Sequence, residues 1–476
     1  MPTDAQAVEP ELHSRPGQSQ AIIDPPGPPA NLLGFLSFLV FGSPRDLTRI
    51  YMDLAREYGD VVRMRAGAWQ FYFVSHPDYV QHVLQSNNHN YGRQSAFNEV
   101  VKQVFGNGLI TSEGEVWRRR RRLAQPAFHR RQIENFATTM VDETTAMLER
   151  WAIVQRADKP FDVMVEMQDL ATMIVGRALF STDLSATDTD EMRQWSRTTL
   201  EYLSRRTRRP LSLPLWVPTP ANRRLQKAVR LSDERVFRII RERRKKIALN
   251  TDGPNDLLDM LLDARDEETG AGLSDQELRN EVTTFIGAGN ETTAVTLAWA
   301  WYLLSKHPEV ARKLHAELDT VLSGRAPGVE DLPQLSYTRM IIEETMRLYP
   351  AAWAIGRGIV GDDVIGHFKI QKGGIMIVSP YVTHRRPDIW DNPEGFEPER
   401  FTPERVAERP RYAYFPFGGG PRQCIGNTFA LMEAQLVLAT VGQKYRLSLV
   451  PGCAVEPDPV FTLRPNRPVM MALQPR

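Results

Sequence analysis

The sequence predicts a mainly α fold with small β-rich segments towards both ends of the chain. From Gln81 to about Thr320, nearly every segment repeats its apolar residues at helical spacing, with breaks at loops rich in Pro, Asp and Gly. Alternating apolar residues predict one hairpin that turns at Ala66-Gly67 and another that turns at Lys372–Gly374. Short closing strands are expected near the C-terminus. With 42% hydrophobic and 25% charged residues among 476, the chain has enough apolar side chains for a sizeable core.

The N-terminal part divides into a tail and the start of the domain. Residues 1–24 are polar, dotted with proline and aperiodic, so we expect a disordered tail followed by a single domain over residues 25–476. The apolar run "NLLGFLSFLVFG", residues 31–42, is too short to span a bilayer. It predicts a packed segment or a peripheral membrane contact, with no transmembrane anchor. The stretch "PRDLTRIYMDLAREYGD", residues 44–60, has helical spacing at Leu47, Ile50, Tyr51 and Leu54, and Gly59 is expected to end that helix.

Composition narrows the function classes. A formal net charge of +1 creates no overall field for a polyanion, which disfavours nucleic acid as a partner. The basic runs at Arg118–Arg120, Arg205–Arg209 and Arg241–Lys246 lack interleaved aromatic residues and are typical of solvated faces. The two cysteines are far apart and no signal peptide is recognisable, so a cytoplasmic, reducing compartment is expected. A monomer is expected as well.

The longest predicted helix carries a polar interruption at its centre. Ser274 and Glu277 form a capping box, and the helix should run from there to about Lys306. Its middle is apolar except for residues 290–293, and burying a carboxylate such as Glu291 is costly unless it is used. Thr292 can bond back to the carbonyl group of Ala288 and leave a polar notch that holds water or oxygen. The alternative is an internal polar cluster whose hydrogen bonds are satisfied.

A cysteine lies at the expected start of another helix, in "FPFGGGPRQCIGNTF". A helix N-terminus favours a thiolate, and the N–H groups of Gly418–Gly420 can point at the sulfur of Cys424. Arg422 adds positive charge. This pattern predicts a thiolate that binds a metal, with an inert buried cysteine as the alternative.

Three further patterns are weak when each is taken alone. Glu344 and Arg347 share one helix face, and Arg400 in "FEPERF" can reach a buried carboxylate. Trp117 and Arg121 are four residues apart, so they lie on one helix face and can jointly meet an acidic group of a ligand.

In this order along the chain, these stretches resemble the cytochrome P-450 superfamily of haem-thiolate monooxygenases. The resemblance runs from about Pro25 to the C-terminus, and "FGGGPRQCIG" is its most specific part. It implies the fold of that superfamily, a triangular prism of helices with a long central distal helix and a small β-rich lobe.

The resemblance also implies a role for each matching residue. Cys424 would be the axial ligand of the haem iron, with Phe417 beside its sulfur. Thr292 and Glu291 would be catalytic and relay protons, whereas His384 would have a minor role. The other haem-binding residues would be Arg422, Trp117, Arg121, Arg357, Gly418, Gly426, Ala288 and Gly289, and a buried structural triad would consist of Glu344, Arg347 and Arg400.

The implied cofactor is haem b (iron protoporphyrin IX), with O2 as co-substrate and electrons from NAD(P)H. Because the chain has no room for a fused reductase, the electrons would come through a ferredoxin and ferredoxin reductase or a flavodoxin-type donor. Such a donor would dock on a basic proximal face, where Arg119 and Arg120 are candidates. The implied reaction inserts one oxygen atom of O2 into an apolar small molecule. A peroxide-driven or non-oxygenase haem-thiolate enzyme and a haem-binding sensor or carrier without turnover are the alternatives.

The substrate pocket is expected to be largely apolar, which suits a fatty acid, a terpenoid or a polyketide-like molecule. Its expected lining comes from residues 91–109, the region around residues 184–215, residues 285–288, residues 353–355 and residues 461–463.

Overall fold

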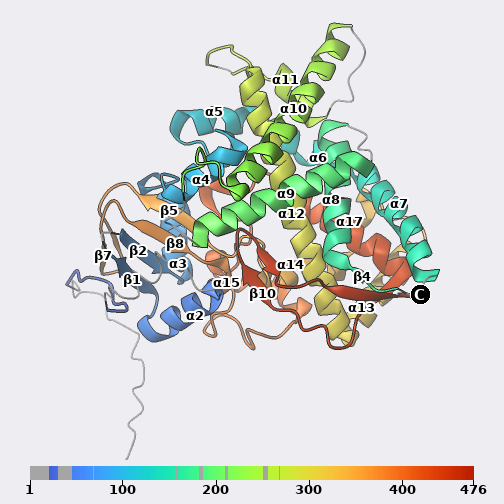
Figure 1. Ribbon diagram of the computed structural model, residues 1–476. Helices are drawn as coiled ribbons and strands as arrows, with labels where there is room; N and C mark the ends of the chain where they lie inside the picture. Colours follow the sequence, from blue (N-terminus) through green and yellow to red (C-terminus); the bar gives the residue numbers. More distant parts are fainter. Residues whose placement is uncertain are drawn as a thin grey trace, which may run out of the picture.

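The structure is a computed structural model that describes residues 21–29, 46–67, 69–156, 159–181, 186–208, 213–249, 256–266 and 268–476. Figure 1 shows that helices fill most of the molecule, while β1, β2, β5 and β8 gather at one side, away from the C-terminus. The predicted mainly α fold is confirmed. The apolar run at residues 31–42 lies outside the described residues.

The described chain contains long helices and many short strands. The α-helices are α2 (Leu47–Tyr58), α3 (Pro77–Gln81), α4 (Ala96–Phe105), α5 (Gly114–Ala124), α6 (Arg130–Glu134), α7 (Ala137–Arg156), α8 (Val163–Phe180), α9 (Ala186–Arg208), α10 (Pro220–Ala248), α11 (Leu257–Asp263), α12 (Asp275–Lys306), α13 (Pro308–Leu322), α14 (Ser336–Leu348), α15 (Pro380–Thr383), α16 (Pro403–Ala407) and α17 (Asn427–Lys444). The strands are β1 (Val61–Ala66), β2 (Trp69–Val74), β3 (Tyr91–Gly92), β4 (Phe161–Asp162), β5 (Ile355–Ile359), β6 (Asp363–Ile365), β7 (Phe368–Ile370), β8 (Ile375–Val378), β9 (Tyr445–Leu449), β10 (Pro457–Pro459), β11 (Leu463–Pro465) and β12 (Met470–Pro475).

Helix α12 is the central element of the helical body. The predicted capping box is present, because Ser274 and Glu277 form reciprocal hydrogen bonds at the start of α12. The helix ends at Lys306, and α13 begins two residues later at Pro308. α12 packs against α8, α10, α14 and α17, and Figure 1 shows it running through the middle of these helices. Because most of its length is surrounded by other helices, polar groups at its centre are held inside the molecule.

The main core lies where α12 meets α7, α8 and α17. Trp151 of α7, Met167 of α8, Trp299 of α12 and Leu436 of α17 are almost completely buried in it. Full burial of one such side chain contributes about 1.5–3 kcal/mol. This core fixes α12 and α17 relative to one another. Among the described residues, no helix combines the length and the apolar character needed to cross a bilayer.

The largest sheet has the strand order β1-β2-β8-β5-β3. The predicted hairpin of β1 and β2 is confirmed, with Ala66 paired with Trp69. The chain turns at Lys372 and Gly373 as predicted, but the predicted hairpin is wrong, because β7 and β8 on either side of that turn do not pair. β6 instead pairs with β7 across Gly366, whose φ of +62° is accessible to glycine, while β8 pairs with β5 and β2 and buries its alternate side chains in the larger sheet.

Two details differ from the expected distribution of elements. β3 and β4 are two-residue strands inside the stretch predicted to be helical. Ile23 makes a bridge to Phe368, and Asp24 forms an ion pair with Arg63 at 2.7 Å, so these residues of the expected tail contact the β-rich part.

Candidate functional site

Cys424 lies at the end of a tight loop that leads into α17. The backbone N–H of Cys424 donates to the carbonyl oxygen of Phe417 at 3.0 Å, and Gly426 is the N-cap residue of the helix. Gly420 has a φ of +63°, and a Cβ there would lie 1.9 Å from the carbonyl oxygen of Leu84. Only glycine fits this close approach. The loop therefore holds Cys424 in one position at the start of α17.

The surroundings of the Cys424 thiol act on its pKa in opposite directions. Burial among protein atoms raises the pKa, whereas the backbone N–H of Gly426 and the positive charge of Arg121 lower it. The residue is nevertheless exposed to solvent. The sulfur is thus accessible to a ligand and has a hydrogen-bond donor from the helix start behind it.

The predicted contact between glycine N–H groups and the sulfur is wrong for Gly418 and Gly420. The N–H of Gly418 donates to the carbonyl oxygen of Phe415 at 2.9 Å, and that of Gly420 donates to the hydroxyl of Tyr412 at 3.1 Å. Both glycines have positive φ, which turns their N–H groups back towards the preceding chain. These amides stabilise the loop itself.

Helix α5 lies against this loop through Trp117 and Arg121. The guanidinium group of Arg422 stacks over the ring of Trp117, 4.1 Å from the centroid, and donates to the carbonyl oxygen of Ser112 at 2.9 Å. Arg121 donates through Nη1 to the carbonyl oxygen of Gln423 at 3.0 Å. The four-residue spacing therefore places Trp117 and Arg121 on one face, as predicted, and that face contacts the cysteine loop.

Two arginines without a carboxylate ion-pair partner lie near Arg422: Arg357 is buried and Arg93 is half-buried. Arg357 on β5 is 5% exposed, and its Nη1 donates to the carbonyl oxygen of Gly356 at 3.1 Å. Arg93, which the sequence interpretation missed, follows β3 and has a buried Nε without a hydrogen-bond partner. Burial and repulsion by Arg93 and Arg422 hold the pKa of Arg357 well below its usual range. Among the described residues, none of these guanidinium groups lies within ion-pair distance of a carboxylate.

The centre of α12 carries the predicted polar notch. The hydroxyl of Thr292 donates to the carbonyl oxygen of Ala288 at 2.7 Å, as expected. The helix is buried on both sides of this point, yet residues 286–289 and Thr292 keep accessible surface. A Cβ on Gly289 would lie 2.9 Å from a methyl group of Val175, so this glycine permits close packing of α8. The accessible face of the notch is thus formed by backbone and by Thr292.

Glu291 is turned towards a different set of residues. Its Oε1 accepts a hydrogen bond from the hydroxyl of Thr462 at 3.1 Å and pairs with Nε of Arg464 at 3.0 Å. Its Oε2 accepts from the side-chain amide of Gln168 at 3.1 Å. Burial raises the pKa of Glu291, while Arg464 and Thr462 lower it. The carboxyl group is therefore held by α8 and β11, next in sequence to the hydroxyl of Thr292.

The predicted triad forms a buried cluster. Nε and Nη2 of Arg347 bind the two carboxylate oxygens of Glu344 at 2.6 and 2.8 Å, and Nε of Arg400 lies 3.4 Å from Glu344 Oε1. Arg347 also donates to the carbonyl oxygen of His384 at 2.9 Å. Nε2 of His384 accepts the backbone N–H of Phe415 at 2.9 Å, and burial holds the pKa of this histidine well below its usual range. The triad is thus linked to the segment that precedes the cysteine loop.

The expectation of a solvated basic face at Arg118–Arg120 is wrong for Arg119 and Arg120. Arg120 is 4% exposed and pairs with Glu281 at 2.6 Å, and Arg119 pairs with Glu277 at 3.0 Å. These contacts join α5 to the acidic first part of α12. Burial therefore excludes Arg120 as a docking residue for an electron donor, and Arg119 is already paired.

Most segments predicted to line a substrate pocket meet in one apolar cluster. It joins α4 and α9 to Leu225 of α10, with Ile286 of α12 and Phe461 packed against it. Trp353 lies apart, stacked against Tyr51, and its indole N–H donates to a backbone carbonyl at 3.0 Å. Residues 182–185 and 209–212 of the expected lining lie outside the described residues.

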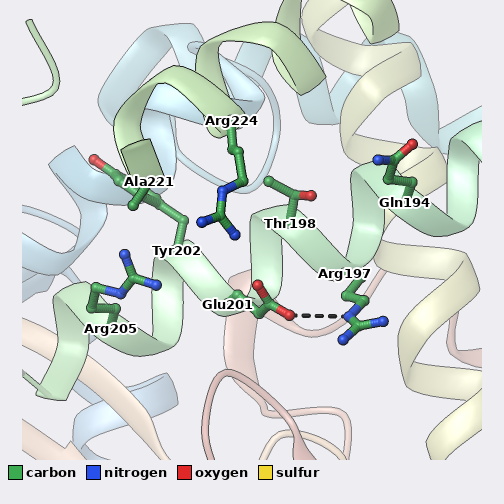
Figure 2. Close-up of a pocket in the computed structure, with 8 residues that line it drawn as sticks. All are labelled: Gln194, Arg197, Thr198, Glu201, Tyr202, Arg205, Ala221 and Arg224. Atoms are coloured by element: carbon green, nitrogen blue, oxygen red, sulfur yellow. Dashed lines mark hydrogen bonds and ion pairs between the residues drawn. The ribbon is translucent and has the colours of Figure 1, made fainter. Parts of the chain in front are cut away.

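A separate groove of about 250 Å³ lies between α9 and α10 (Figure 2). Figure 2 shows that charged side chains dominate its lining, with Arg197 bound to Glu201 at 3.0 Å and with Arg205 and Arg224 on the two helices. Its α9 residues fall within the predicted lining region 184–215, but none of the predicted catalytic or haem-binding residues lines it. This groove is not the apolar pocket that the sequence predicts.

The comparisons with known proteins agree with this geometry. The family model described as Cytochrome P450 matches residues 25–472. Cyclooctatin synthase and cyclooctat-9-en-7-ol 5-monooxygenase of Streptomyces melanosporofaciens are each 38% identical, over 88% and 83% of this chain and 89% and 84% of their own lengths. Pentalenene oxygenase of Streptomyces avermitilis is 35% identical over 90% of this chain and 92% of its own. The crystal structure of the cytochrome P450DA heme domain superimposes with a TM-score of 0.85 and 27% identity, covering 96% of this chain and 99% of that chain.

Proposed function

The chain belongs to the cytochrome P450 family of monooxygenases, and on that premise we propose that Cys424 is the axial ligand of a haem b group and that the substrate is a cyclic terpenoid. The observation that carries the proposal is Cys424 itself, an accessible sulfur with an N–H donor behind it, beside arginines without a carboxylate ion-pair partner.

The residues fit the two chemical ends of a haem group. In this family the haem iron is held by a cysteine thiolate. A bound metal cation deprotonates a coordinating thiol even where burial raises the pKa of the free thiol. The propionate groups of haem are anions that bind cations. Arg357, which is buried, and Arg422, which is half-buried, are two neighbouring cations that repel one another. Trp117 and Arg121 would also bind the propionate groups. Gly418 and Gly426 have no side chains that could crowd the haem beside the sulfur of Cys424.

The distal residues act on oxygen and protons. When bound, haem supplies the iron at which O2 is activated. Thr292 places a hydroxyl on the accessible face of α12, and this O–H donates a hydrogen bond to the carbonyl oxygen of Ala288. Glu291 holds a carboxyl group inside the helical body and exchanges protons with the notch. Gly289 has no side chain, so α8 can pack closely against α12 at the notch.

The substrate class is supported by the relatives and by the apolar cluster. Two of the matched relatives are named as a cyclooctat-9-en-7-ol 5-monooxygenase and a pentalenene oxygenase. In this chain, the cluster around Phe105, Trp195 and Ile286 offers an apolar wall beside the notch. A fatty acid or polyketide-like molecule is the alternative substrate class.

Electrons reach the site from separate proteins in this proposal. A ferredoxin with its reductase, or a flavodoxin-type donor, supplies electrons from NAD(P)H. A hollow of about 170 Å³ lies against Phe417 and Gln423 and is bounded by Arg339 and Glu343 of α14. We place the donor over this hollow because it lies against the cysteine loop.

The ligation is tested by the absorption spectrum of the reduced protein under carbon monoxide. A red-shifted Soret band is expected for the wild-type protein and should be lost in Cys424→Ser, whereas Cys453→Ser, the other cysteine, should keep it. A band without the red shift in the wild-type protein would overturn the proposal.

The substrate class is tested by a spin-shift titration with a panel of cyclic terpenes, fatty acids and macrolactones. A high-spin shift at micromolar cyclic terpene, with none for the other classes, is the expected result. A shift with fatty acids alone would assign the alternative class.

A further inference from the structure

The carboxylate of Glu113 lies beside the arginine cluster formed by Arg93, Arg357 and Arg422. Glu113 is the N-cap residue of α5, yet its side chain makes no capping hydrogen bond to that helix. Its Oε1 instead accepts the backbone N–H of Arg93. The carboxylate is therefore withdrawn from its own helix and joined to the segment that carries Arg93.

The packing leaves little freedom for this contact. A Cβ on Gly92 would lie 3.0 Å from Glu113 Oε1, so the carboxylate sits directly against the backbone of β3. The preceding residue, Ser112, accepts a hydrogen bond from Arg422 through its carbonyl oxygen at 2.9 Å. One short stretch of chain thus contacts Arg93 with a side chain and Arg422 with its backbone.

The electrostatics point the same way. Burial lowers the pKa of Arg93, and the charge of Glu113 opposes this effect. The same carboxylate raises the pKa of Arg357 and of Arg422, whereas the charge of Arg93 lowers both. Glu113 is thus the acidic group that offsets the repulsion among Arg93, Arg357 and Arg422.

We propose that Glu113 is a positioning residue of the haem-propionate site, which fixes Arg93 as an additional propionate-binding residue and sets the net charge beside the haem. This inference rests on the proposed function. Removal of a negative charge near the iron stabilises the ferrous form, because that form carries one positive charge fewer than the ferric form. The reduction potential of the haem therefore depends on whether Glu113 carries its negative charge.

The experiment compares Glu113→Gln with Glu115→Gln in the haem-loaded protein. The amide introduced by E113Q would keep an oxygen that accepts the N–H of Arg93 and would lack the charge. Glu115 lies two residues away on α5, is exposed and pairs with Arg118, so it is a matched control. A positive shift of the midpoint potential is expected for E113Q and none for E115Q. Potentials that coincide in E113Q, E115Q and wild type would overturn the inference.

Two further variants keep the test decisive. Arg93→Gln should shift the potential in the negative direction, and the double variant with E113Q should lie between the single variants. If E113Q fails to retain haem, Glu113→Asp decides: retention with a wild-type potential supports the need for a carboxylate, and loss of haem in both variants overturns it in favour of a steric role. If wild type itself lacks the thiolate spectrum, the proposed function fails and not this inference alone.

Discussion

Nε of Arg464 lies 3.0 Å from Oε1 of Glu291, so that β11 near the C-terminus holds the carboxyl group at the centre of α12. The pair is formed by residues that are far apart in sequence. Burial raises the pKa of Glu291, and the positive charge of Arg464 is the largest effect that lowers it.

Replacement of Arg464 by Gln should raise the pKa of Glu291 further, because burial then acts without its main opposition. The limb of the pH–turnover profile that depends on ionised Glu291 should move to higher pH. Measurement of product formation from pH 5 to 9 checks this. Arg467→Gln, an exposed arginine in the same segment, is the control and should leave the profile in place. An unmoved limb in R464Q would contradict the proton role of Glu291.

Replacement of Thr292 by Ala should separate electron consumption from product formation. The variant lacks the hydroxyl on the accessible face of α12, and positioned proton donors contribute about 10²–10⁴-fold to rates. NAD(P)H consumption should continue while the yield of product per electron falls by about tenfold, with hydrogen peroxide as the balance.

Thr296→Ala is the matched control for this prediction, because its hydroxyl makes the same type of bond, to the carbonyl oxygen of Thr292 at 3.0 Å, one turn further along. Thr292→Ser should restore most of the yield. A peroxide-driven enzyme would show equal yields in all these variants when supplied with peroxide, and unchanged coupling in T292A would favour that alternative.

Replacement of Glu344 by Gln should destabilise the protein strongly. Arg347 and Arg400 would keep their charges inside the core without the carboxylate that both contact. Removal of one partner of a buried pair costs about 3–5 kcal/mol. Chemical denaturation should register this loss, whereas Glu309→Gln, which removes an exposed pair with Arg312, should cost about 0–1 kcal/mol. Equal stabilities of the two variants would show that the triad is not structural.

Replacement of Glu433 by Gln should change how stability depends on pH. Glu433 on α17 is completely buried, and this burial raises the pKa of its carboxyl group well above 4.5 against a smaller opposing effect of Thr293. Above about pH 4.5 the unfolded chain releases this proton and the folded chain keeps it. The free energy of unfolding therefore falls with rising pH, by up to about 1.4 kcal/mol per pH unit until the folded pKa is reached.

In E433Q this contribution is absent, so the variant should gain stability relative to wild type between pH 5 and 8. Urea unfolding at several pH values measures the difference. Glu149→Gln on the exposed side of α7 is the control and should follow wild type. Parallel curves for E433Q and wild type would mean that Glu433 is ionised in the folded protein.

Local chemistry explains the parts of the fold that could be predicted. The capping box at Ser274 and the glycine stop at Gly59 depend on residues only a few positions apart, and both are observed. The hairpin predicted around Lys372–Gly374 is wrong because the chain can turn both there and at Gly366, and which strands pair depends on which sheet buries β8.

The sequence by itself determined the family, the loop that presents Cys424, the helix that carries Thr292 and the face shared by Trp117 and Arg121. Each of these depends on a short pattern whose geometry is set by backbone dihedral angles and helix periodicity. The tertiary structure alone decided that Arg120 is buried and that Arg93 joins the arginine cluster. It also decided that Arg464 pairs with Glu291. The partner of a charged side chain is set by which distant segments pack together, and a single arginine in a three-residue strand carries no periodic signal.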